Sequence, residues 1–506
     1  MRCPHLPKPA FFALALLLCS SLLATPIHAT EIAASLRASI NAGRSVEVII
    51  EFNDTGGRPS TPPNASFESK VAATATHLRA SAASSQAEVL KVLRARVIEH
   101  RPFWIANAIW ARLDGATLDQ LAGMAEVRRI DPNSILQQQL PPALPTSIRA
   151  PAAIEWGVQR VGAPALWARG IRGQGVVVAG QDTGYQWDHP ALRSAYRGWN
   201  GTAADHNYHW HDAIHALIGA GSNACGIDSP APCDDHNHGS HTMGSMVGDD
   251  GAANQIGVAP AARWIGCRNM ERGNGTPATY LECLQWFLAP TDLAGNNPDP
   301  SRAPHIINNS WGCPPSEGCT TVGILEDAVD NLRAAGILVV VSAGNSGSAC
   351  GSIDTAPGPY SSSFTVGASD SNDLIASFSS RGPATVDGVT FLLKPDISGP
   401  GVTIRSSVRG GNYANISGTS MAGPHVAGAA ALLMSAEPRL RGNPQAVEAL
   451  LRASARPQLS TQSCGGFLGS LVPNAVFGHG IVHAERAVAL IGPLFSNGFE
   501  TGPTTR

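Results

Sequence analysis

The chain has 506 residues, which is too long for one ordinary hydrophobic core, so two or more domains are expected. Hydrophobic residues make up 43% of the chain, which is ample for globular cores. The formal net charge of −3 excludes the strongly basic surface with which many nucleic-acid-binding proteins attract phosphates, so we expect no nucleic acid partner.

The first 29 residues predict a secretory signal peptide. Arg2 and Lys8 supply positive charge, residues 11–23 are apolar, and the sequence IHA at 27–29 is an acceptable cleavage site. A membrane anchor is the alternative, but this stretch is too short, and no later apolar run reaches the roughly 18 residues that a span needs. We expect a secreted protein, extracellular or periplasmic, with no membrane contact in its mature form.

Export permits disulfide bonds, and the cysteine count is compatible with them. Removing Cys3 and Cys19 of the signal region from the ten cysteines leaves eight, enough for four bridges. Short intervening loops favour Cys225–Cys233 and Cys313–Cys319, with free buried thiols as the alternative. Since no CxxC pair occurs, a zinc or redox centre of that type is not expected.

Residues 30–145 predict a small α+β domain. The expected strands lie at 45–52, 109–113 and 127–130, and the expected helices at 70–96 and 117–124. The following segment, residues 137–151, is rich in proline and glutamine. It predicts an exposed linker that is open to cleavage.

From residue 152 to about 491, expected strands alternate with expected helices, as is typical of a parallel sheet covered on both faces. The strands are expected at 176–179, 264–267, 305–308, 337–342 and 364–368. Sheets of this kind bind ligands at the carboxyl ends of their strands, where Asp182, Ser310 and Asn345 follow. Residues 493–506 lack periodicity and predict a disordered tail.

Three chemically reactive residues stand where a strand or loop gives way to an expected helix. Asp182 begins DTG, His238 begins HGSH, and Ser420 lies in GTSMAGPHVAG at 418–428. An acid, a histidine and a serine are the parts of a nucleophilic hydrolase. Their order along the chain is that of subtilisin and differs from those of chymotrypsin and the α/β-hydrolases. The chain resembles the subtilisin-like serine protease (subtilase) family.

The resemblance implies a role for each residue. Ser420 would be the nucleophile, His238 the general base, and Asp182 the group that orients the imidazole. Asn345, which ends the sequence AGN, would donate its side-chain amide to the oxyanion. The implied fold is a subtilisin-like parallel sheet with helices on both faces, preceded by an inhibitory propeptide; a permanently attached accessory domain is the alternative for residues 30–145.

The resemblance also implies an extended substrate held between two strand segments. SWG at 310–312 matches the family segment that pairs with substrate, RGNG at 272–275 would form the opposing edge, and SAG at 342–344 one wall of the primary pocket. The expected substrate-binding residues are Gly273, Gly275, Ser310, Trp311, Gly312, Ser342, Ala343 and Gly344. A place in the core is the alternative for Trp311.

Plainer interpretations compete with these assignments. A serine at a helix start is often only a cap, and an asparagine after a strand often only forms a turn. His236 and His241 lie near His238 and allow a metal cluster, but no HExxH sequence is present, and we expect His241 to pack within its helix. Asp188 is a rival acid that lacks the preceding strand and the Thr-Gly turn.

Three further sequences resemble the bacillopeptidase F-like branch of subtilases: YRGWN at 196–200, NQIGVAP at 254–260 and NNSWG at 308–312. The long interval between Asp182 and His238 is similar to that branch too. Four histidines lie within this interval and allow a metal site, although a solvated insertion loop is the expected alternative. They are His206, His209, His211 and His215.

Many subtilases place an aspartate that binds calcium after a His-Pro pair, and here that position is Ala191. Asp249, Asp250 and Asn254 could hold a cation by another route. We expect no required cofactor and no catalytic metal, while a structural calcium is left open.

The sequence therefore predicts a secreted serine endopeptidase, monomeric, acting on protein or peptide substrates and inhibited by its own propeptide until it processes itself. The expected divisions are a signal peptide (1–29), a propeptide (30–145), a catalytic domain (146–492) and a tail (493–506). The alternative is a catalytically silent subtilase-fold binding module. An α/β-hydrolase esterase is excluded because Ser420 lacks a GxSxG sequence.

Overall fold

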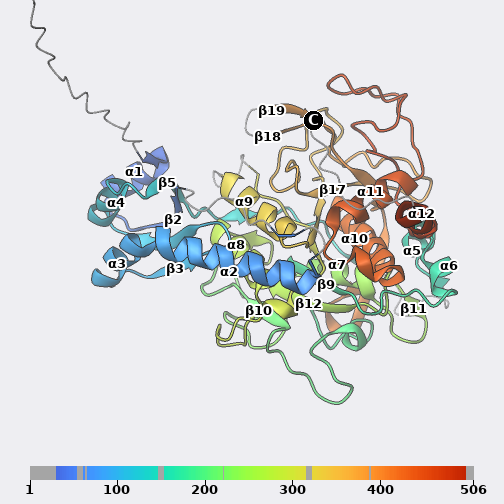
Figure 1. Cartoon of the computed structure of the whole chain (residues 1–506), viewed down its shortest axis with the longest axis horizontal. Coiled ribbons are helices and arrows are strands. Elements are labelled where there is room, and N and C mark those ends of the chain that lie inside the picture. Colours follow the sequence, from blue (N-terminus) through green and yellow to red (C-terminus); the bar gives the residue numbers. More distant parts are fainter. Residues whose placement is uncertain are drawn as a thin grey trace, which may run out of the picture.

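The chain forms two units, an α+β unit at the amino end and a larger α/β unit, drawn blue and green to red in Figure 1. The description rests on a computed structural model. It covers residues 30–53, 61–62, 65–145, 153–219, 221–314, 319, 322–386 and 389–496. The expected signal peptide lies outside these residues.

The amino-terminal unit has one five-stranded sheet with the order β1-β5-β2-β4-β3. Its strands are β1 (Glu31–Ile32), β2 (Val46–Phe52), β3 (His100–Phe103), β4 (Ala108–Leu113) and β5 (Val127–Pro132). Its helices are α1 (Ala34–Asn41), α2 (Phe67–Ser85), α3 (Ala87–Ala95) and α4 (Gly115–Ala122). The single helix expected at 70–96 is two helices that meet at Gln86, and α1 and β3 were not expected.

The larger unit is built on a seven-stranded parallel sheet with the order β10-β12-β9-β15-β16-β17-β20. The strands are β9 (Val177–Asp182), β10 (Trp210–Asp212), β12 (Arg263–Arg268), β15 (Ile306–Asn309), β16 (Leu338–Ser342), β17 (Phe364–Ser369) and β20 (Ile397–Pro400). The five expected strands and the α/β fold class are confirmed. The two edge strands were missed because β10 has three residues and β20 contains glycine and proline.

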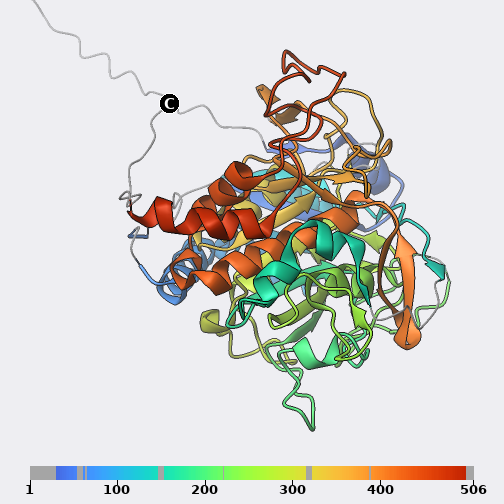
Figure 2. The same ribbon diagram turned by 90° about the vertical axis from the view of Figure 1, so that its right-hand side faces the viewer.

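Helices cover both faces of this sheet, and alternate strand residues point into two separate cores. Val178 and Ile306 face the core beneath α7, α10, α11 and α12, whereas their neighbours Ala179 and Ile307 face the core beneath α8 and α9. Figure 2 shows α11 and α12 in red beside α10. The helices are α5 (Trp156–Arg160), α6 (Ala163–Trp167), α7 (His238–Val247), α8 (Pro277–Leu288), α9 (Val322–Ala334), α10 (Thr419–Ala436), α11 (Pro444–Ser454) and α12 (Ala484–Ser496).

The last helix, the lack of a membrane-spanning helix and the disulfides can each be compared with the sequence predictions. Helix α12 continues to Ser496, so the expected division before residue 493 cuts a helix. Among the described helices, none is long and apolar enough to cross a membrane. The described residues form four disulfides, Cys225–Cys233, Cys267–Cys283, Cys313–Cys319 and Cys350–Cys464, and the two expected pairs are among them.

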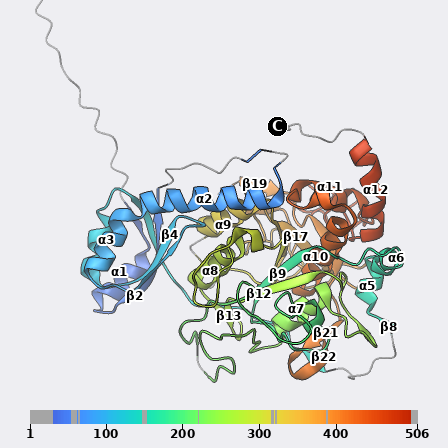
Figure 3. The same ribbon diagram turned by 60° about the horizontal axis from the view of Figure 1, so that its bottom comes forward.

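The amino-terminal unit docks on the larger unit through α2 and the β3–β4 turn, and Figure 3 shows α2 lying along α9. The side chain of Gln285 accepts hydrogen bonds from the backbone N–H groups of Trp104 (2.7 Å) and Ile105 (3.3 Å). Asn331 donates to the carbonyl of Ile105 at 2.8 Å. The turn is therefore held by side chains of α8 and α9 through its backbone.

The histidine-rich interval is not the solvated loop that was expected, because its side chains are tied to neighbouring elements. His211 and His215 both place Nε2 at 2.8 Å from one oxygen of Glu282 on α8. Arg101 of β3 donates to the other oxygen of Glu282, also at 2.8 Å. His209 is buried, and Tyr196 and His206 are hydrogen-bonded. One buried carboxylate thus binds two histidines of its own unit and one arginine of the amino-terminal unit.

This cluster predicts a loss of stability in alkali. Burial alone would lower the pKa of His215, but hydrogen bonds and the charge of Glu282 raise it to about 9, above the ordinary 6.5. The bound proton therefore stabilises the fold fully below pH 6.5, and this contribution disappears as the pH rises through about 9. We expect His215→Gln, in a Ser420→Ala background that prevents proteolysis, to flatten the fall in melting temperature between pH 7 and 10. The effect should reach about 1–2 kcal/mol after solvent screening, and parallel melting curves would contradict it.

Candidate active site

Asp182 and His238 are in direct contact at the carboxyl end of β9, and Ser420 lies at the start of α10, which packs against α7. Asp182 is the last residue of β9, His238 is the first of α7, and Ser420 lies in the first turn of α10. All three are buried, with exposed fractions of 1%, 0% and 5%. Nδ1 of His238 lies 2.8 and 3.0 Å from the two carboxylate oxygens of Asp182.

Two glycines allow these elements to approach. Gly184 has a φ of +101°, and a Cβ there would lie 1.8 Å from the carbonyl oxygen of Cys233. A Cβ on Gly239 would lie 2.0 Å from the carbonyl oxygen of Gly184. Any side chain at either position would push α7 away from the turn that follows β9. The sequences DTG and HG therefore carry a packing requirement as well as chemistry.

The Asp182 carboxylate is held by further donors. The backbone N–H of Thr183 donates to Oδ1 at 2.7 Å, and the Thr242 hydroxyl lies 3.4 Å from Oδ2. An ionised carboxylate only accepts hydrogen bonds, so the His238 nitrogen that faces it is the N–H form. That tautomer leaves Nε2 as the acceptor, and Nε2 has no hydrogen-bond partner among the described residues.

The Ser420 hydroxyl points to Ser310 in this structure. Its Oγ donates to the Ser310 carbonyl at 3.2 Å, while the Ser310 hydroxyl donates to the Ser420 carbonyl at 2.9 Å. No hydrogen bond between Ser420 and His238 is formed within the described chain. Ser420 and His238 belong to the packed helices α10 and α7, and hydrogen bonds in active sites often tighten only when substrate binds.

Asn345 follows β16 and reaches the start of α10. Its side-chain oxygen accepts hydrogen bonds from the backbone N–H (2.9 Å) and the hydroxyl (3.0 Å) of Thr419. Thr419 therefore occupies the side-chain oxygen of Asn345, and the amide Nδ2 lies on the side away from these two donors. A Cβ on Gly418 would lie 3.6 Å from this nitrogen and 3.6 Å from Pro141. The Nδ2 donor of Asn345 therefore lies near the start of α10, where the chain segment 136–145 passes.

That segment belongs to the stretch expected to be an exposed linker: Gln137, Gln139, Pro142 and Leu144 are exposed, but parts of it are paired with strands of the larger unit. β6 (Leu136–Gln137) pairs antiparallel with β14 (Asn274–Gly275), next to β13 (Met270–Glu271). Further along, β7 (Leu144–Pro145) pairs with β22 (Asn412–Ile416), which pairs with β21 (Ile404–Val408). The chain between them passes Gly418 at the start of α10. It is held because both ends complete the edges of small sheets.

Gln138 shows how closely this segment imitates a bound strand. Its backbone N–H donates to the Gly273 carbonyl at 2.8 Å. Its side-chain amide bonds both the N–H (3.1 Å) and the carbonyl of Gly312. Two of the glycines expected to bind substrate therefore hold the chain's own residues from opposite sides.

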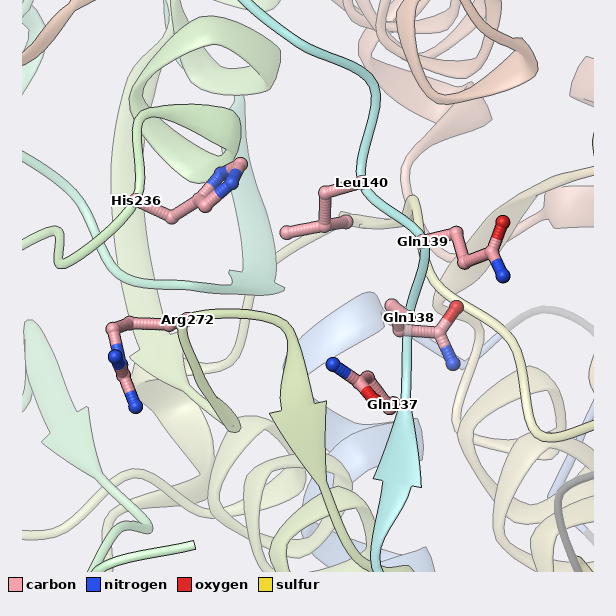
Figure 4. Close-up of a pocket in the computed structure, with 6 residues that line it drawn as sticks. All are labelled: Gln137, Gln138, Gln139, Leu140, His236 and Arg272. Atoms are coloured by element: carbon pink, nitrogen blue, oxygen red, sulfur yellow. The ribbon is translucent and has the colours of Figure 1, made fainter. Parts of the chain in front are cut away.

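A cavity of about 450 Å³ adjoins this segment and is shown in Figure 4. His236 points across it toward Leu140, with Arg272 on the same side as His236. Its lining residues are Gln137, Gln138, Gln139, Leu140, His236 and Arg272. Burial raises the pKa of the nearby Asp235 to about 7, although that carboxylate accepts a hydrogen bond from the Arg272 backbone.

The remaining residues expected to bind substrate lie in two different surroundings, the core and the turn before Asn345. Trp311 is only 4% exposed and stacks on Tyr280 at 4.0 Å, in the core that also contains Leu136. The Trp311 ring therefore lies in the core, which was the alternative prediction for this residue. Ser342 and Ala343 are buried at the end of β16, and Gly344 has a φ of +100°. These three residues directly precede Asn345 and form the turn that positions its side chain.

The structure also separates the alternatives left open by the sequence. Nε2 of His241 bonds two backbone carbonyls, at 2.9 and 3.2 Å, and burial lowers its pKa to about 3. Among the described residues, no group of three or more His, Cys, Asp or Glu is arranged to hold a metal ion. The acid that faces His238 is Asp182, whereas Asp188 lies beyond the turn, next to a histidine that bonds Asn412.

The residues considered for calcium are engaged with protein groups. Ala191 is buried in a small cluster with Ile256 and Tyr413. Asp249 pairs with Arg172 at 3.2 Å. Asp250 accepts hydrogen bonds from the backbone and side chain of Asn254, at 3.0 and 2.6 Å. These contacts tie both carboxylates to protein groups.

Sequence reasoning missed two features of the site. One is the role of Leu136 and Gln138 as occupants of the cleft, which no local pattern indicates. The other is Asp234, which lies four residues before His238 and contacts both sides of the site. An acidic residue just ahead of a helix start is a capping signal and could have drawn attention to it.

Comparison with known proteins agrees with this geometry. Residues 173–480 match the model of the subtilase family. The chain is 35% identical to bacillopeptidase F of Bacillus subtilis (strain 168) over 496 residues, which cover 91% of this chain and 32% of that protein. It is 35% identical to subtilisin Savinase of Lederbergia lenta over 287 residues (56% of this chain, 86% of that protein). It thus spans about a third of bacillopeptidase F but most of the smaller subtilisin. The matched region includes the whole site, and the chain belongs to the subtilase family of serine peptidases.

Proposed function

We propose that this protein is a serine endopeptidase that hydrolyses peptide bonds through an acyl-enzyme. The observation that carries the proposal is the His238 imidazole, bonded through Nδ1 to Asp182 and unpartnered at Nε2, beside a serine in a cleft that holds an extended peptide. A buried polar atom without a partner costs stability, and its presence here is explained by a task in catalysis.

In the proposed reaction, Ser420 Oγ leaves the Ser310 carbonyl and attacks the scissile carbonyl while His238 Nε2 takes its proton. Asp182 stabilises the resulting imidazolium and keeps its ring in place. The Asn345 Nδ2 group and the Ser420 backbone N–H donate to the oxyanion, at the positive end of α10. His238 then protonates the leaving amine, and a water molecule hydrolyses the acyl-enzyme by the same steps in reverse.

We infer further that residues 30–145 are an inhibitory propeptide and that the protein is exported. The segment from Leu136 to Pro145 supports this proposal because β6 pairs with the edge at Asn274–Gly275, the Gln138 side chain bonds Gly312 of the other expected edge, and the chain then passes the start of α10. As long as it stays there, another peptide cannot take the same backbone partners. Self-cleavage within residues 137–151, followed by release of the amino-terminal unit, would free the cleft of a monomeric catalytic domain.

A fluorophosphonate probe, which reacts with activated serines, tests the proposed activity directly. We expect the matured wild-type protein to become labelled at Ser420, located by peptide mass spectrometry, and Ser420→Ala to stay unlabelled. Labelling should be slower before maturation because the amino-terminal unit covers the site. A catalytically silent binding module would leave Ser420 unlabelled in the matured wild-type chain, and that result would overturn the proposal.

A further inference from the structure

Asp234 lies on the loop before α7 and is only 3% exposed. Its side chain accepts four hydrogen bonds. Oδ1 receives the Thr183 hydroxyl (2.9 Å) and the backbone N–H groups of His236 (2.9 Å) and Asn237 (3.0 Å), while Oδ2 receives the N–H of Ser240 (2.9 Å). A buried carboxylate with four donors is strongly fixed in position.

These donors come from both sides of the site. Thr183 is the neighbour of Asp182, whereas the three backbone donors flank His238. The Thr183 hydroxyl also accepts a hydrogen bond from the Gly239 N–H at 3.1 Å. One side chain therefore joins the turn after β9 to the first turn of α7, the two segments whose spacing sets the contact between Asp182 and His238.

Two side chains from outside the helix accept its first N–H groups, Thr183 from Gly239 and Asp234 from Ser240. Asn237 occupies the N-cap position of α7 with a φ of +126° and makes no capping hydrogen bond. Asp234 takes over this function by accepting from Ser240, the third residue of the helix. Its negative charge also lies at the positive end of the helix dipole, close to the imidazole that becomes positively charged in the proposed reaction.

We propose that Asp234 is a positioning residue of the triad: it locks the Asp182–Thr183 turn to the start of α7, so that His238 stays on Asp182 and presents Nε2 to Ser420. Asp234 acts through these neighbours and makes no contact with Ser420. The inference rests on the proposed peptidase function, but it makes a claim about geometry that can be measured without turnover.

The kinetic test uses the full chain after maturation and a peptide substrate. Asp234→Ala should lower kcat by about 10²-fold, because misplacement of a catalytic group by about 1 Å has an effect of this size. KM should change less than about threefold, since no substrate-contacting residue moves. Asp234→Asn keeps an oxygen acceptor but loses the charge, so it should lower kcat less and move the acid limb of the kcat/KM profile to lower pH.

Asp212→Asn is the matched control. Asp212 is also buried and accepts backbone N–H groups, from Ile214 (3.1 Å) and Ser229 (2.7 Å), but it contacts no residue of the triad. We expect it to lower the melting temperature without moving the acid limb. A merely structural Asp234 would behave in the same way, with kcat per titrated active site unchanged, and that result would overturn the proposal.

A spectroscopic measurement separates this inference from the proposed function. In the catalytically inert Ser420→Ala chain, the His238 N–H that faces Asp182 should give a low-field proton resonance. We expect the resonance to persist with Asp212→Asn and to disappear with Asp234→Ala. Its persistence in folded Asp234→Ala would refute the positioning role. If the probe does not label the matured wild-type protein but the resonance of the Ser420→Ala chain still depends on Asp234, the peptidase function is refuted and the positioning role is not.

Discussion

Ser420→Ala should lower kcat for peptide hydrolysis by about 10⁶-fold, the scale measured for the corresponding change in subtilisin. The reason is that the proposed reaction forms its acyl-enzyme on the Ser420 hydroxyl, whose proton His238 would take. The same variant should accumulate as the uncleaved precursor. Hydrolysis of a chromogenic peptide and the intact mass of the secreted protein measure both effects.

Ser417→Ala provides the control, because Ser417 lies three residues away and only accepts a hydrogen bond from the Thr403 backbone at 2.8 Å. It should mature and turn over substrate like the wild type. A matured and active Ser420→Ala protein would contradict the assignment of the nucleophile. Precursor that is cleaved but inactive would show that another protease performs the maturation.

The second large effect is expected at Asn345. Asn345→Ala should lower kcat by about 10²–10³-fold with little change in KM, because the lost donor acts on the oxyanion and not on the bound substrate. This scale is also carried over from subtilisin. Steady-state kinetics on a peptide ester and a peptide amide would measure the loss for both kinds of leaving group.

The structure allows the two functions of the Asn345 side chain to be separated. Asn345→Asp keeps an oxygen for Thr419 but replaces the Nδ2 donor, so it should lose at least as much activity as Asn345→Ala. Thr419→Ala removes one of the two contacts with the side-chain oxygen and leaves the donor in place. It should lose less than about tenfold. The reverse order of effects would assign Asn345 a structural role only.

The fold could be predicted in part because local patterns are strong where strands are fully buried. Apolar runs such as those of β9 and β16 point to the middle of a parallel sheet. The alternation of β2 predicted a half-buried strand; the strand is confirmed, but Val48–Phe52 are all buried because this sheet is packed on both faces. The edge strand β10 escaped prediction since three residues carry no readable period. The start of the disordered tail was predicted too early because the proline near the end of α12 indicates a helix end. The helix nevertheless continues to Ser496, and its earlier residues pack on the core.

The histidine-rich interval illustrates a different failure. Histidine and charged residues in sequence indicate solvent, yet His211, His215 and Arg101 share the Glu282 carboxylate across two units. Their partner lies 67 or more residues away in the chain, so no local pattern could name it. Only the docking of β3 on α8 removes these groups from water and shifts the pKa of His215.

The sequence by itself indicated the residues that we propose for the chemistry, because the motifs around Asp182, His238 and Ser420 combine reactive side chains with the glycines that their turns require. It also indicated where along the chain the strands before Asp182, Ser310 and Asn345 lie. Tertiary structure alone decided that Asp234 joins two of these segments and that residues 136–145 lie in the cleft. Both depend on hydrogen bonds between segments distant in the chain, which form only when the sheet and its helices bring them together.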